Sequence, residues 1–182
     1  FGLGFSEIMS LPMTTEEDHY TKFRLEVPEH YPRVANPKLK ALTVIRTHLM
    51  SGVMQALNEN RRRPMPVRLF ELDNVVALDE SGVNGVREER RLCLAEVGVE
   101  VGYANARAVL DSLLRELGEE ATYEPFDGPT FVPGRAATFE TESFSGVLGE
   151  LHPEVVTGFG LDHPVAIVEL TLSTVDIGAY AH

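Results

Sequence analysis

The sequence is poor in features that would point to a secreted or membrane protein. Its 182 residues include one cysteine, Cys93, which cannot form an internal disulfide and so fits a reducing cytoplasm. No apolar run approaches the roughly 18 residues needed to span a bilayer. We therefore expect a cytoplasmic protein with no membrane role.

Positive charge is scarce as well. Twenty-eight acidic residues against 16 basic ones give a net charge of −12, and only three of the bases are lysine. Such a surface repels a phosphate backbone, so the chain as a whole is a poor candidate for the main nucleic-acid surface of any assembly. This balance is typical of salt-loving organisms, whose acidic surfaces keep proteins solvated, although high genomic GC content also replaces lysine by arginine.

The chain has the length and composition of one globular unit. Its hydrophobic share of 43% and charged share of 24% are ordinary, and neither a repeat nor a low-complexity linker divides it. We expect a single domain over residues 1–182. The first residues, Phe1 to Gly4, include no initiator methionine and no charged n-region, which indicates a piece of a longer protein rather than a signal peptide.

The first third of the chain is expected to be irregular, with one long helix. The run Thr14 to Asp18 has the composition of a helix cap. Residues Lys22 to Val27 alternate apolar and charged side chains, which predicts a half-buried strand. From Ala41 to Asn60 the apolar residues recur near helical spacing, which predicts a helix with an irregular start.

The remainder alternates strands with two helices. The clearest helix has an apolar stripe between Ala106 and Leu117 with Gly118 as its C-cap, and a short helix begins at Pro153. The expected strands cover residues 67–78, 91–101, 122–123, 136–139, 146–151 and 165–172. Consecutive strands without regular helical crossovers favour an α+β fold, an antiparallel sheet flanked by helices.

Several short motifs follow one another along the chain. They are Leu3-Gly-Phe-Ser-Glu7, Asn36-Pro37, Arg46-Thr-His-Leu49, Leu69-Phe-Glu-Leu72, Phe131-Val-Pro-Gly-Arg-Ala136, Gly149-Glu-Leu-His-Pro-Glu154 and Phe159-Gly-Leu161. Each is weak by itself, but in this order and spacing they resemble the class II synthetase-like core of the phenylalanyl-tRNA synthetase beta subunit, in its archaeal and eukaryotic form. The resemblance extends over nearly the whole chain and implies the class II aminoacyl-tRNA synthetase fold.

Elementary chemistry gives the residues of these motifs mostly structural roles. Arg46 is placed to satisfy nearby carboxylates. Phe70 and Leu72 are expected to face the packed side of the sheet, with Glu71 on the opposite side. Gly149 suits a close backbone approach, where a side chain would clash.

The resemblance implies that the parent synthetase joins phenylalanine to tRNA(Phe) with ATP and magnesium. Class II catalysis depends on two arginines that hold the α- and γ-phosphates of ATP, because charge builds on those oxygens. At the corresponding positions this sequence has Ala77 and Leu170, neither of them charged. We therefore expect no catalytic and no cofactor-binding residue in this chain.

For two further candidate sites, the sequence favours a structural role over a metal-binding or catalytic one. Glu150, His152 and Glu154 could be imagined as metal ligands, but a proline interrupts them and no second ligand cluster is spaced to complete a site, so we expect no metal. Cys93 lies in an apolar run, which favours a small core residue over a nucleophile.

The resemblance also implies partners. In this family the module packs against the catalytic alpha subunit, and a second beta chain completes an α2β2 tetramer that binds tRNA(Phe). We place the subunit contact on the helix within 41–60, because a helix with apolar residues on more than one face usually has more than one surface to bury. The contributing residues would be Leu49, Met50, Val53, Met54 and Leu57. The alternative is that all five belong to the core of the domain itself.

Other readings of the function stay open. The chain could be a stand-alone synthetase-like paralogue that binds another protein or RNA, or an enzyme with an unorthodox site. The basic clusters Arg61 to Arg63 and Arg87 to Arg91 would then be candidate contacts, although such runs are usually a solvated face.

Overall fold

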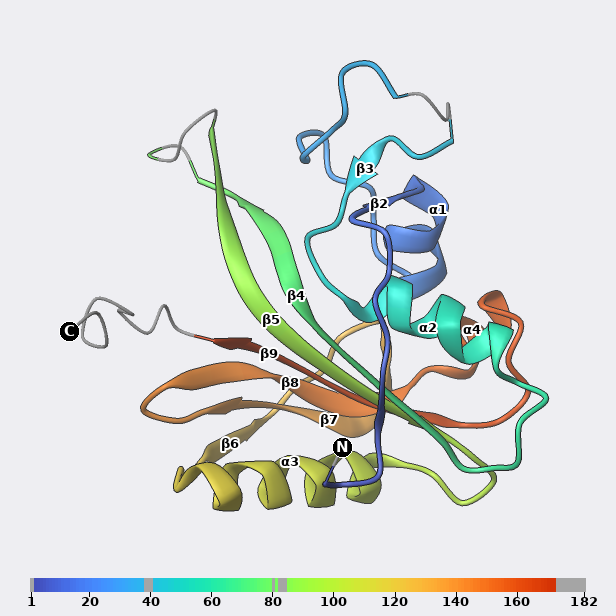
Figure 1. Ribbon diagram of the computed structural model, residues 1–182, viewed down its shortest axis with the longest axis vertical. Helices are drawn as coiled ribbons and strands as arrows, with labels where there is room; N and C mark the ends of the chain where they lie inside the picture. Colours follow the sequence, from blue (N-terminus) through green and yellow to red (C-terminus); the bar gives the residue numbers. More distant parts are fainter. Residues whose placement is uncertain (1, 38–40, 80, 82–84, 173–182) are drawn as a thin grey trace.

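A seven-stranded sheet forms the centre of the fold in the computed structural model, which describes residues 2–37, 41–79, 81 and 85–172 (Figure 1). Across the sheet the strands follow the order β1 (Ser6–Glu7), β4 (Val67–Leu78), β5 (Val86–Val97), β9 (Val165–Leu172), β8 (Phe144–Leu151), β7 (Phe131–Glu140) and β6 (Thr122–Pro125). All neighbours are antiparallel except the short β1, which runs parallel to β4. The antiparallel α+β fold expected from the sequence is confirmed.

Helices cover both faces of the sheet. Figure 1 shows α3 (Tyr103–Leu117) on one face, and α2 (Met50–Glu59) with α4 (Pro153–Gly158) on the other. Beyond α2 lie the short helix α1 (Glu16–His19), a 3₁₀ turn, η1 (Thr21–Phe23), and a two-stranded sheet of β2 (Met13–Thr14) and β3 (Val44–Ile45). Among the described helices, none is both long and apolar enough to cross a membrane.

The alternation of side chains along the strands creates two apolar cores. In the centre of the sheet, Phe70 of β4, Leu94 of β5 and Val168 of β9 are in register and pack on the side of α3. Their neighbours one residue along, Leu69 and Ala95 among them, face α2 and α4. Both faces are therefore packed, because successive side chains point to opposite sides of a sheet.

The predictions for the second half of the chain are largely confirmed. Helix α3 ends at Gly118, which has φ 73° and donates its amide to the carbonyl groups of Arg115 and Leu114. Helix α4 begins at Pro153, as expected. The strand predicted at 91–101 instead spans Val86–Val97, and residues 80 and 82–84 before it lie outside the described residues.

The strand predicted at Lys22 to Val27 is wrong. Residues Thr21–Phe23 form the 3₁₀ turn, and Arg24 follows in the left-handed conformation with φ 61°. The turn brings Phe23 into the core, where its ring centroid lies 5.1 Å from that of Phe159 and its side chain is fully buried. Burial of one aromatic ring outweighs the local alternation of charged and apolar residues.

The helix predicted at Ala41 to Asn60 begins later than expected. Helix α2 starts at Met50, because Val44–Ile45 pair with β2 and the Arg46 amide donates to the Pro12 carbonyl at 3.0 Å. The β-branched residues here favour an extended backbone. The tertiary pairing therefore replaces the first turns of the predicted helix.

The amino-terminal chain crosses the edge of the sheet from one core to the other. Phe5 packs in the α3 core, and the Ile8 amide then donates to the Phe70 carbonyl at 2.9 Å as the chain passes β4. Residues 8–14, which we call the strap, run on over α2 into β2 (Figure 1).

Gly149 allows two strands to approach closely at the β7 irregularity. A Cβ atom at this position would lie 2.6 Å from Phe131 Cδ1, 2.8 Å from Ala136 Cβ and 2.9 Å from the Arg135 carbonyl oxygen. The backbone atom cannot move aside without disturbing the strand pairing. The close approach expected at Gly149 is confirmed.

We predict that Gly149→Ala lowers the free energy of unfolding by about 1–3 kcal/mol, the usual cost of overpacking. Urea denaturation measures the change. Gly2→Ala is the matched control, because a Cβ there meets no atom within 4 Å. Equal stabilities for the two variants would contradict the steric explanation.

Candidate functional site

Charged side chains are buried on the α2 face of the sheet. Glu71 of β4, Cys93 of β5 and Glu169 of β9 are in register across three neighbouring strands, and the exposed fractions of the two glutamates are only 1% and 4%. Glu71 lies on the side opposite Phe70, as expected from the sequence, but that side is packed as well: Glu71 is far more buried than Leu72, which is 39% exposed. A buried carboxylate requires a counter-charge.

Arg46 supplies that counter-charge and closes the edge of β4. Its guanidinium lies 2.9 Å from Glu71 Oε1 and 2.6 Å from Asp73 Oδ2, and its Nε donates to the Asn74 carbonyl at 3.1 Å. The Arg46 carbonyl in turn accepts the Val76 amide at 3.0 Å. The carboxylate partners expected for Arg46 are confirmed. The Arg46 backbone also accepts a hydrogen bond from β4, as the backbone of a neighbouring strand would.

Ser10 joins the strap to this ion pair. Its amide donates to Glu71 Oε1 at 2.9 Å, and its hydroxyl lies within 2.9 Å of both Glu71 and Arg46 Nη1. The strap can cross α2 here only because residue 52 is glycine: a Cβ at Gly52 would lie 2.1 Å from Ser10 Oγ. One buried carboxylate therefore holds strand β4, the strap and the segment before α2 together.

The second buried carboxylate caps the N-terminus of helix α2. Glu169 accepts the amides of Leu49 and Met50 at 3.1–3.2 Å, where the positive end of the helix dipole favours a carboxylate. Arg91 Nη1 lies 3.0 Å from the same glutamate. Burial raises the pKa of the Cys93 thiol, and the nearby carboxylates of Glu169 and Glu71 raise it further. The thiol stays protonated, in keeping with the core role expected for it.

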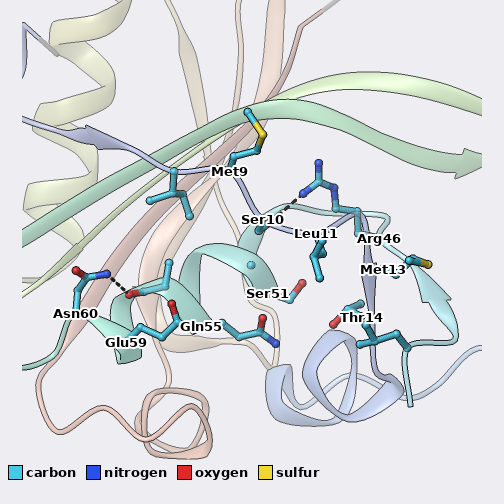
Figure 2. Close-up of a pocket in the computed structure, with 14 residues that line it drawn as sticks. Met9, Ser10, Leu11, Met13, Thr14, Arg46, Ser51, Gln55, Glu59 and Asn60 are labelled. Carbon is cyan, nitrogen blue, oxygen red and sulfur yellow. Dashed lines mark hydrogen bonds between the residues drawn. The ribbon is translucent and has the colours of Figure 1, made fainter. Parts of the chain in front are cut away.

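A cleft of about 510 Å³ lies between the strap and α2 (Figure 2). Figure 2 shows the strap as one wall and α2 as the other, with Leu11 between them and Gln55 and Glu59 projecting from the helix. Arg46 also lines the cleft. We call this space the strap cleft, and its volume falls within the roughly 300–1,000 Å³ typical of binding sites.

Several groups at the strap cleft have no partner in the described part of the chain. Met9 and Leu11 are 91% and 66% exposed. Thr14 is only 6% exposed, yet its hydroxyl oxygen has no hydrogen-bond partner among the described residues. Sequence reasoning did not single out these residues, because unpartnered groups show no pattern in a sequence.

The five residues predicted for a subunit contact are placed mostly inside the chain. Leu49, Val53, Met54 and Leu57 are completely buried in the α2 core, as the alternative reading described them, and Met50 alone is partly exposed. A partner could reach this helix only through the residues of its outward face. The contact predicted for the helix stays a prediction.

The residues considered as metal ligands are engaged elsewhere. Glu150 pairs with Arg135 at 2.8 Å and Glu154 with Arg24 at 3.0 Å, while His152 Nδ1 accepts the Glu154 amide at 3.2 Å as the N-cap of α4. Within the described ranges, no group of histidine, cysteine and acidic side chains could hold a metal ion.

The positions assigned to the two phosphate-holding arginines face opposite sides of the sheet. Ala77 lies on the α2 face, in line with Glu71, whereas Leu170 is buried on the α3 face. Two groups that hold one nucleotide must share a face, so one of the two correspondences is displaced by a residue. Displacement to Val76, or to Glu169 or Thr171, again meets no arginine.

The basic clusters differ in how far they are neutralised. Arg87 and Arg91 pair with Glu89 at 2.6 and 2.7 Å, and Arg90 lies 3.4 Å from Asp73. In the cluster Arg61 to Arg63, after α2, Arg61 hydrogen-bonds to Asn58 and all three side chains are exposed.

A buried pair of histidines attaches α1 to the start of α2. The rings of His19 and His48 stack at 3.9 Å, and the amide of Thr47 donates to His19 Nε2 at 3.1 Å. Burial, together with the neighbouring His48, lowers the pKa of His19 to about 2. Burial also lowers the pKa of His48, while Glu169 opposes that shift. Both rings are therefore neutral near pH 7.

Comparison with known proteins gives a consistent result. Residues 1–172 match the family model described as the phenylalanyl tRNA synthetase beta chain CLM domain. Phenylalanine–tRNA ligase beta subunits of Methanosphaera stadtmanae and Thermofilum pendens are 33% and 35% identical over 96% of this chain, and that of Methanopyrus kandleri is 38% identical over 88%. The matches cover 33%, 31% and 28% of those relatives, so the chain spans about a third of their length.

We predict that Arg46→Met lowers the free energy of unfolding by about 3–5 kcal/mol, because it leaves Glu71 buried without its counter-charge. Arg90→Met is the matched control: Arg90 is 48% exposed and its pair with Asp73 contributes at most about 1 kcal/mol. In urea titrations, the double variant Arg46→Met/Glu71→Leu should recover much of the loss. A similar small loss for Arg46→Met and Arg90→Met would contradict the role given to the buried pair.

We also predict that stability falls with pH below about 6.5. The unfolded chain protonates both histidines near their ordinary pKa, whereas the folded chain keeps them neutral, so acid favours the unfolded state. The free energy of unfolding should decrease by up to about 1.4 kcal/mol per histidine for each pH unit. Asp73 and Glu89, with lowered pKa values, add to acid unfolding only below roughly pH 4.

Urea midpoints between pH 7.5 and 5 check this dependence. The variant His19→Gln should show a shallower slope than the unaltered chain. A free energy of unfolding that stays constant over this range would refute the neutral histidine pair.

Proposed function

The chain belongs to the phenylalanyl-tRNA synthetase beta chain family, and we propose that within this family it is a non-catalytic assembly module that packs against the catalytic alpha subunit. The observation that carries the proposal is the pairing of the arginines on the α2 face with the chain's own carboxylates. A synthetase-like core whose arginines are bound by its own carboxylates keeps the fold, but those arginines are not free to bind phosphate.

The charges on this face do not fit a nucleotide polyphosphate. Arg46 is bound to Glu71 and Asp73, and Arg91 to Glu89 and Glu169. Arg87 and Arg90 also pair with Glu89 and Asp73, so these four carboxylates engage four arginines, and a polyphosphate placed here would have to displace them. Phosphoryl chemistry requires the opposite, cations directed at the phosphate oxygens.

The wider assembly follows from the same proposal. ATP and magnesium would act in the catalytic alpha subunit, and two alpha and two beta chains would form an α2β2 synthetase that charges tRNA(Phe) in the cytoplasm. With a net charge of −12, the chain would contribute to tRNA binding only through the complex as a whole.

We predict that the chain, co-expressed with the alpha subunit of the same organism, co-purifies and co-elutes with it in gel filtration. The beta subunit in full is the positive control. The chain alone should show no heat of binding when ATP or phenylalanine is titrated into it.

Two results would contradict the proposal. If the beta subunit binds the alpha subunit and the chain does not, the chain is not the assembly module. If the isolated chain binds ATP with micromolar affinity, it is not a non-catalytic scaffold.

A further inference from the structure

We propose that residues 173–182, which we call the tail, dock in an apolar groove on the α3 face of the sheet. The groove has a volume of about 540 Å³, and Leu3, Leu72, Leu92 and Leu113 are among the residues that line it. We call it the leucine groove. The tail lies outside the described residues, and it follows the last residue matched by the family model, 172. The inference does not depend on the assembly role proposed above.

The leucine groove exists because α3 covers only part of its face of the sheet. Leu72 of β4, Leu92 of β5 and Leu170 of β9 form one row in register. Helix α3 packs on β8, β9 and the near part of β5, so Leu170 is only 2% exposed, Leu92 is partly exposed and Leu72 is 39% exposed. The exposure of the row therefore rises with distance from the helix.

The walls of the leucine groove are apolar on both sides. Leu113 projects from α3 on one side, and Leu3, which is 38% exposed, approaches from the amino-terminal segment. Glu116 is the one charged residue among the described residues that line it. Adjacent exposed apolar side chains of this kind mark a surface that another segment covers. The lining selects an apolar segment that keeps negative charge away from Glu116.

The tail starts at the margin of the leucine groove. Strand β9 ends at Leu172, which lies opposite Arg90 of β5 and packs on the same α3 core as Leu92. From the spacing and rise of neighbouring strands, Leu172 lies about 12 Å from Leu72. Ten extended residues span up to roughly 33 Å, so the tail can cross the groove completely. A tethered segment also has an effective concentration on the order of millimolar, which favours it over a separate molecule.

The side chains of the tail fit this lining. Its ten residues include Val175, Ile177 and Tyr180, and among them there is no lysine, arginine or glutamate. The polar residues Thr174 and Asp176 alternate with the two aliphatic ones, which is typical of an extended segment with one apolar side. With that side on the leucines, Asp176 faces water. The ring of Tyr180 adds apolar area while its hydroxyl stays at the rim.

The experiment places a nitroxide spin label on the tail of the complete chain and records the methyl NMR signals. The single cysteine, Cys93, is completely buried, so a thiol-reactive label attaches selectively to the variant Asp176→Cys. The methyl signals of Leu72 and Leu113 should lose most of their intensity. Those of Leu161, which is buried on the opposite face of the sheet beyond α4, should keep theirs.

Two substitutions in the labelled chain test the contact from both sides. Ile177→Asp in the tail and Leu72→Asn in the groove should each restore most of the intensity lost by Leu113, because each places a polar group in an apolar contact. Leu78→Asn is the matched control. Leu78 lies on the same strand and the same face, is 55% exposed and does not line the groove, so this variant should leave the loss unchanged.

A mixed sample distinguishes the tail from a second copy of the chain. Spin-labelled chain without isotopes is mixed with isotope-labelled chain without the nitroxide, and docking within one chain should leave the Leu72 and Leu113 signals unchanged. Loss of their intensity in the mixture would place a second copy in the groove and overturn the proposed occupant. Full intensity of both leucines in the labelled chain, or an equal loss at Leu161, would overturn the docking. None of these results bears on binding to the alpha subunit.

Discussion

The fold depends on the ion pair between Arg46 and Glu71, because both groups are removed from water at the point where three segments meet. Strand β4 carries the carboxylate, the segment before α2 carries the guanidinium, and Ser10 of the strap binds both. A buried charge without its partner costs several kcal/mol. Displacement of any one of these segments would therefore leave a buried charged or polar group of the others without its partner. The position of the strap, and therefore the existence of the strap cleft, follows from this constraint.

The second buried carboxylate orients the other wall of the same cleft. Glu169 lies in register with Glu71, two strands away, and accepts the first amides of α2. The sheet thus holds the strap through one carboxylate and the helix through the other. Because the sheet holds the strap and α2 in place, their side chains can contact a partner without a rearrangement of the backbone. The same carboxylates use up the arginines that a nucleotide would need, which is why a docking role and a catalytic role exclude each other on this face.

The parts of the fold that could be predicted from the sequence are those with local causes. Helix α3 has an apolar stripe and a glycine at its end, and α4 begins at a proline, so neither depends on distant residues. The errors occurred at Lys22 to Val27 and at the start of α2. There, burial of Phe23 and the pairing of Val44–Ile45 with β2 decide the backbone, and both depend on residues distant in the chain.

The site was harder to predict than the fold. Glu169, a lone carboxylate in an otherwise apolar strand, was a visible signal of a buried polar partner. Ser10 and Thr14 gave no such signal, since their roles come from the crossing of the strap over α2. For Ala77 and Leu170, the positions assigned to the two phosphate-holding arginines, only the strand register shows that they lie on opposite faces.

Hydrogen–deuterium exchange of the chain, free and bound to the alpha subunit, tests most directly whether this module serves assembly. We predict that binding slows exchange along α2 (Met50–Glu59), the helix on which the subunit contact is expected, and leaves α3 and β6 unchanged. Slowed exchange confined to α3 and β6, with the strap and α2 unaffected in a confirmed complex, would contradict it.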